Sequence, residues 1–211
     1  MLVDSLLELF KSDIIKRKVY EDLRLQKTLD ENGFAEDRVE DIFRTLVVSK
    51  RLHSRIKVSE FAFLQHYGIF RKDLVYDRGQ AVDKDQTWSL DMGDPKAMEA
   101  VIRCCLGDRL KNGVALYASF FIGPQKFYSD LREMDEDRLR LIDMRGVDYV
   151  NQLYGDEELK RAQRSHGRFI NGGLMVHLTE AVTADCLEDH RLISGPGGQY
   201  NFVSMAHVLN T

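Results

Sequence analysis

The feature that most limits the fold is a strand, helix, strand pattern in the middle of the chain. Residues 114–122 form an apolar, aromatic-rich run that is typical of a buried strand. Gly123 and Pro124 follow, and proline is well tolerated in the first turn of a helix. Residues 139–144 resemble a second strand. Because two strands joined through a helix run parallel, the pattern predicts an α/β fold with a mostly parallel sheet and flanking helices.

A strand, glycine turn, helix pattern lies further along the sequence. Residues 191–194 are expected to form a strand and residues 199–207 a helix, with Gly-Pro-Gly-Gly between them. Such a turn exposes backbone N–H groups beside a helix N-terminus, where an anion or a developing oxyanion can bind. The glycine spacing fits neither the dinucleotide-binding pattern nor the P-loop pattern. A tight turn that needs positive φ and binds nothing is the alternative explanation.

The chain divides by pattern into two parts. Its first fifty residues have apolar side chains at helical spacing, whereas residues 68–96 are less periodic and rich in glycine and charge. We therefore expect residues 1–96 to form a helical segment followed by a surface excursion. Residues 97–211 are expected to form an α/β core that is incomplete at its C-terminal end.

Composition excludes several classes of protein. A net charge of −4 gives no general reason to expect nucleic acid binding. The sequence has no signal-peptide pattern and no run of about 18 apolar residues, so neither export nor membrane insertion is indicated and a cytoplasmic location is expected. Cys104, Cys105 and Cys186 lack zinc or disulfide spacing, and the histidines lack metal spacing. No metal site is therefore predicted.

Four stretches together resemble the acetyl-CoA hydrolase/transferase family of coenzyme A transferases. They are residues 120–128, 149–155, 168–171 and 194–203, of which the last is the most specific. The resemblance implies a fold similar to part of the CoA-transferase catalytic domain, preceded by a helical segment. It is strongest from about residue 113 to residue 208.

The resemblance also implies a chemistry. In that family a glutamate carboxylate attacks an acyl-CoA thioester, and a glutamyl-CoA thioester then passes CoA to an acceptor carboxylate or to water. The corresponding glutamate would lie just before Met1, so the chain looks like an internal fragment that is expected to be inactive alone. Glu8 and Glu180 are conceivable substitutes, but a glutamate that faces solvent explains each of them better.

By resemblance, Gly195, Gly197, Gly198 and Gln199 form the loop that binds the acyl-CoA carbonyl and supplies backbone donors to an oxyanion. Asn171 is a candidate for orienting the substrate, or for a strand-end hydrogen bond. Coenzyme A is expected as a substrate in thioester form, with no permanently bound cofactor.

The expected partners are an acyl-CoA and a small carboxylate, together with a second copy of the chain or a complementary fragment. No nucleic acid or membrane partner is expected. Hydrolase and transferase activity stay open as alternatives. So does a noncatalytic module that binds CoA or another anion, or that pairs with the other subunit of a split CoA-transferase. A vestigial chain without a stable fold is the third possibility.

Overall fold

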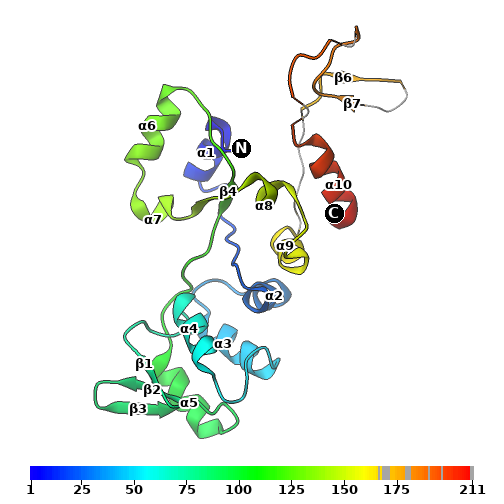
Figure 1. Cartoon of the computed structure of the whole chain (residues 1–211). Helices are drawn as coiled ribbons and strands as arrows, with labels where there is room; N and C mark the ends of the chain where they lie inside the picture. Colours follow the sequence, from blue (N-terminus) through cyan, green and yellow to red (C-terminus); the bar gives the residue numbers. More distant parts are fainter. Residues whose placement is uncertain (166, 168–171, 179–181, 190, 196, 210–211) are drawn as a thin grey trace.

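The computed structural model describes residues 1–165, 167, 172–178, 182–189, 191–195 and 197–209 (Figure 1). These residues form a mixed α/β fold with ten helices and three small sheets. Two separate hydrophobic cores hold it together. No helix among the described residues is both long and apolar enough to span a membrane.

The larger core lies within residues 20–110, where helices pack beside a three-stranded antiparallel sheet. Its elements are α2 (Leu23–Asn32), α3 (Val39–Val48), α4 (Val58–His66), β1 (Val75–Asp77), β2 (Gln80–Asp83), β3 (Gln86–Ser89) and α5 (Pro95–Cys105). Asp22 caps α2 by accepting hydrogen bonds from two backbone N–H groups. Arg78 and Gly79, both at positive φ, make the two-residue turn that joins β1 to β2.

The smaller core joins α1 (Asp4–Lys11) to the central strand, helix, strand unit. β4 (Leu116–Ala118) and β5 (Ile142–Met144) pair in parallel and are connected through α6 (Gln125–Glu133) and α7 (Glu136–Leu139). Phe10 and Phe127 are buried between these elements. The predicted strand, helix, strand unit is therefore confirmed at this place.

The prediction of a mostly parallel sheet is wrong. Within the described residues only β4 and β5 form a parallel strand pair, whereas the first sheet and the pair β6 (Met175–Val176) and β7 (Val182–Thr183) are antiparallel. The apolar run at 114–122 contributes only three strand residues, and the side chains of Phe120, Phe121 and Ile122 after them are 53%, 47% and 58% exposed. The strand expected at 191–194 is reduced to an isolated bridge between Cys186 and Leu192.

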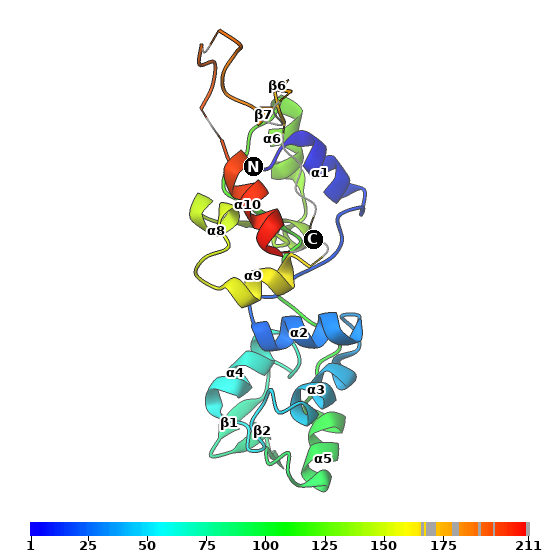
Figure 2. The same cartoon turned by 90° about the vertical axis from the view of Figure 1, so that its right-hand side faces the viewer.

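The remaining helices are α8 (Val147–Asn151), α9 (Glu157–Gln163) and α10 (Gln199–Leu209). Figures 1 and 2 both place α9 between α2 and α10. Gln163 at the end of α9 donates its side-chain amide to the Tyr20 carbonyl at 2.9 Å, and Arg17 donates to the Gln163 carbonyl at 2.9 Å. Arg161 donates to the Val208 carbonyl of α10 at 2.8 Å. Helix α9 therefore links the larger core to the last helix.

Candidate functional site

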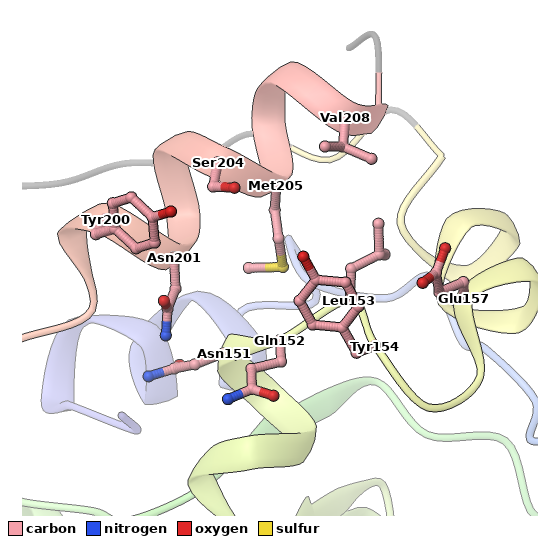
Figure 3. A pocket seen from close by; sticks show the side chains of 10 residues that line it. All are labelled: Asn151, Gln152, Leu153, Tyr154, Glu157, Tyr200, Asn201, Ser204, Met205 and Val208. Atoms are coloured by element: carbon pink, nitrogen blue, oxygen red, sulfur yellow. The ribbon is translucent and has the colours of Figure 1, made fainter.

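A pocket of about 200 Å³ lies between α10 and the chain at the end of α8 (Figure 3). Ten residues line it: Asn151, Gln152, Leu153, Tyr154, Glu157, Tyr200, Asn201, Ser204, Met205 and Val208. One wall comes from the stretch 149–155 and the facing wall begins within the stretch 194–203, both of which the sequence analysis singled out. The fold thus brings together two segments that are far apart in the sequence.

The walls of this pocket are apolar at the base and carry amides at one edge. Leu153 and Met205 are buried, and Figure 3 shows the side chains of Asn151 and Asn201 directed toward one another across the pocket. Glu157 is the single acidic side chain among the ten lining residues. Such a lining suits a ligand with both apolar and amide groups.

The three glycines of the turn have different structural roles. Gly197 adopts φ +58°, a conformation in which a side chain is strained. A Cβ on Gly198 would lie 3.3 Å from Asn151 Nδ2 and 3.1 Å from Phe202 Cε2, so this glycine permits close approach to the pocket wall. A Cβ on Gly195 would meet no atom within 4 Å. Glycine is thus favoured at 197 by its backbone conformation and at 198 by the close approach of two side chains.

The side chain of Gln199 contacts β7 and is not among the residues that line the pocket. Its Nε2 donates to the Val182 carbonyl of β7 at 3.4 Å, a long hydrogen bond. Ser194 Oγ donates to the Ala184 carbonyl at 3.3 Å. Both contacts tie the turn to the segment that contains β7. Asn171 and Glu180, two candidates from the sequence, lie outside the described residues.

Two cations of α9 hold the α8 wall in place, and sequence reasoning missed both. Lys160 is only 4% exposed, and its Nζ donates to the carbonyls of Gln152 at 3.1 Å and Tyr154 at 2.8 Å. Arg164, just after the helix, donates to the Tyr149 carbonyl at 3.3 Å and also contacts Met205. The Arg164 contact fits because the Tyr149 carbonyl belongs to the last turn of α8, where carbonyls lack partners within the helix.

Burial affects the ionisation of these groups. It lowers the pKa of Lys160, and the positive charge of Arg164 lowers it further. Burial also lowers the pKa of Arg164. The ring of Tyr149 lies 5.0 Å from Lys160 Nζ on one side and 5.4 Å, between centroids, from the ring of Tyr117. No sequence signal marks these contacts, since a lysine in a charged helix normally faces solvent.

Glu8 lies outside the pocket. Its carboxylate is exposed and forms ion pairs with Lys11 at 3.1 Å and Lys126 at 3.4 Å, and hydrogen bonds from these lysines lower its pKa. Within the described part of the chain, no group of three or more His, Cys, Asp and Glu side chains is placed to hold a metal ion.

Comparison with known proteins gives one match. Residues 123–211 match the model of the acetyl-CoA hydrolase/transferase C-terminal domain. This range contains all ten residues of the pocket between α8 and α10. The resemblance to this family is thereby confirmed for this part of the chain. No curated protein and no solved structure matches the sequence.

Proposed function

We propose that this chain, whose residues 123–211 carry the acetyl-CoA hydrolase/transferase C-terminal domain, binds an acyl-CoA thioester in the pocket between α8 and α10. The observation that carries the proposal is the meeting of the stretches 149–155 and 194–203 in one pocket. Proteins of this family act on CoA thioesters, and the amide-bearing, largely apolar walls suit the uncharged arm of such a substrate. The coenzyme is then a substrate rather than a resident cofactor.

The turn before α10 supplies hydrogen-bond donors in this proposal. Helix geometry leaves the N–H groups at the start of α10 without acceptors inside the helix. The backbone amides of Gly197, Gly198 and Gln199 would donate to the thioester oxygen as it gains negative charge during attack on the carbonyl carbon. Proline has no N–H, so Pro196 contributes no donor. Gly195 belongs to the same loop, and Asn171 stays a candidate for orienting the substrate.

We propose that this chain binds the substrate and stabilises the oxyanion, and we leave the identity of the nucleophile to the measurement of thiol release. The acceptor in the complete reaction is a small carboxylate for a transferase and water for a hydrolase. We propose residues 97–211 as the α/β part that holds this activity, and residues 1–96 as a preceding helical segment with a surface excursion. A cytoplasmic location fits this chemistry.

A binding module without catalysis is the second candidate function. One observation favours it. Glu157 is the single carboxylate among the residues that line the pocket, so the pocket offers few candidates for a nucleophilic carboxylate. This module would bind CoA and pair with a second copy or with another subunit that carries the nucleophile. Release of free thiol distinguishes the two candidates.

The test is a calorimetric titration of the full chain with acetyl-CoA, with free thiol measured in the same sample. We expect saturable binding that Gly198→Asp abolishes, because the new side chain enters the space beside Asn151 and carries a negative charge. Gly172→Asp is the matched control, since it adds the same group outside the turn and the pocket, where no atom lies within 4 Å. Equal binding by both variants and the unmodified chain would contradict the site assignment.

Thiol release then decides between catalysis and binding alone. Release that Glu157→Gln removes would identify this carboxylate as a participant in catalysis. Binding without release supports the binding module. Absence of binding at millimolar acetyl-CoA would refute the proposed function in both forms.

A further inference from the structure

A second hollow, of about 660 Å³, lies in the larger core region and outside the range that matches the family model. It is bounded by α2, α3, α4 and the segment that joins α3 to α4. Ten residues line it: Arg24, Val47, Val48, Lys50, Arg51, Leu52, His53, Ser54, Glu60 and Met92. Three permanent cations and one histidine thus face a space with several apolar side chains.

The acidic residue in this hollow is already fully engaged. Glu60 is 5% exposed, and its Oε1 accepts hydrogen bonds from the His53 backbone N–H at 3.0 Å and from His53 Nδ1 at 2.9 Å. Its Oε2 accepts from the Lys57 backbone N–H at 3.0 Å. Burial raises the pKa of Glu60, but these hydrogen bonds lower it by more, so the group stays ionised. Both oxygens of this carboxylate already accept hydrogen bonds, and one of these bonds fixes the orientation of the His53 ring.

The orientation of His53 follows from these contacts. Because Nδ1 donates to Glu60, Nε2 is the acceptor, and Lys57 Nζ lies 2.9 Å from it. The His53 side chain is 60% exposed, so it lies at the rim of the hollow. A lysine ammonium is therefore held beside the rim as well.

Two arginines are held in place at the hollow by ion pairs, and each keeps an N–H group that has no acceptor among the described residues. Arg24 Nη2 pairs with Asp22 at 2.9 Å, and the guanidinium lies 4.3 Å from the centre of the Phe63 ring. Arg51 Nη2 pairs with Glu31 at 2.6 Å. Within the described residues, Arg24 Nη1 and Arg51 Nε make no hydrogen bond. Guanidinium groups held in this way are preorganised to bind carboxylate or phosphate.

Lys50 provides an independent observation. It follows α3 at φ +57°, in the left-handed region where glycine is the favoured residue at a helix C-terminus. Its ammonium has no ion pair or hydrogen bond in the part of the chain that the structure describes. The chain thus places a free cation beside the hollow at a position where the backbone disfavours any side chain.

Apolar side chains line the rest of the hollow. Val48 is 76% exposed, although it lies next to the buried end of α3. Val47, Leu52 and Met92 extend the same apolar surface. An inorganic ion would leave this surface in contact with water, whereas a ligand with an apolar group would cover it.

We propose that this hollow binds an amphipathic anion, that is, a carboxylate or phosphate attached to an apolar group. The oxyanion contacts Arg24, Arg51 and Lys50, and the apolar group packs on Val47 and Val48. Carboxylate and phosphate are alike in the property that the site recognises: each is a compact oxyanion that can accept hydrogen bonds from several N–H groups. This inference does not depend on acyl-CoA binding between α8 and α10.

The experiment titrates the full chain with hexyl phosphate, hexanoate and inorganic phosphate, and follows binding by calorimetry. We expect one or both organic anions to bind, and inorganic phosphate to bind at least several-fold more weakly because it leaves the apolar wall uncovered. The stronger of the two organic ligands identifies the headgroup. Failure of both to bind at millimolar concentration, or equal binding of inorganic phosphate, would overturn the proposal.

Lys50→Gly tests the site without damaging the fold. Glycine fits the left-handed conformation, so the thermal midpoint should not fall, while loss of the ammonium should weaken binding about tenfold. Lys84→Gly is the matched control, because Lys84 also has positive φ, +51°, but lies in the turn between β2 and β3. Unchanged affinity in Lys50→Gly, or an equal loss in Lys84→Gly, would overturn the assignment.

Discussion

Replacing Lys160 by methionine tests whether a buried cation supports the wall of the pocket between α8 and α10. Methionine keeps the apolar stem but removes two hydrogen bonds, to the Gln152 and Tyr154 carbonyls. Each hydrogen bond from a charged donor contributes about 1.5–3 kcal/mol, or about 3–6 kcal/mol for two. Burial of the ammonium opposes this gain, as its lowered pKa shows. We therefore expect a net loss of about 2 kcal/mol in the free energy of unfolding.

Urea denaturation measures this loss, and the acetyl-CoA titration measures its effect on the pocket. Lys160→Met should weaken acetyl-CoA binding, because the freed carbonyls belong to residues that line the pocket. Lys27→Met is the control, since the Lys27 side chain is 43% exposed and, among the described residues, pairs only with exposed Glu158 at 3.2 Å, so a loss of about 0.5 kcal/mol or less is expected. A similar stability for both variants would refute the reasoning, as would unchanged acetyl-CoA binding by Lys160→Met.

Two further predictions concern the glycine turn and the larger core. Gly197→Ala should destabilise the folded chain by about 1 kcal/mol because its φ is +58°, while Gly195→Ala should stay within about 0.5 kcal/mol; thermal unfolding of both variants checks the difference. Burial, helped by the negative charges of Asp22 and Glu21, raises the pKa of Tyr67 to about 12. The folded state therefore holds this proton more tightly, so its contribution to stability is complete below pH 10 and is lost as pH rises toward 12. The unfolding midpoint of the unmodified chain should fall more steeply over this range than that of Tyr67→Phe, and an equal fall in both chains would contradict the assignment.

Sequence patterns predicted the elements that form from residues close together in the sequence. The run at 114–122, the proline-led helix after it and the strand near residue 142 lie close together in the sequence, and the structure pairs β4 with β5 as expected. The helix after the glycine turn also forms, as α10. In these places apolar spacing and turn residues act within about thirty residues.

Interactions that depend on distant partners were not predictable in the same way. Residues 120–122 are apolar enough for a strand but have too little covering structure, so they lie exposed. The strands β1 to β3 have only three or four residues and each ends in a polar residue, so only the Arg78-Gly79 turn marks them. Lys160 finds its acceptors only when α9 packs on the end of α8.

The same holds for the candidate site. Resemblance selected the stretches 149–155 and 194–203, but neither periodicity nor glycine spacing indicates that they form facing walls of one pocket. The roles of individual glycines also needed coordinates, because close approach at Gly198 depends on Asn151, which lies almost fifty residues earlier.

The position of α9 makes the pocket between α8 and α10 thermodynamically dependent on a region outside the family match. A helix of seven residues has little stability of its own, so α9 depends on packing against α2 and on the bonds from Arg17 and Gln163. Local opening of α2 therefore removes the support of α9 and, through Lys160, of the pocket wall. The amide protons of α8 and α9 should then exchange with solvent in the same cooperative unit as those of α2, although α2 lies more than a hundred residues away in the sequence.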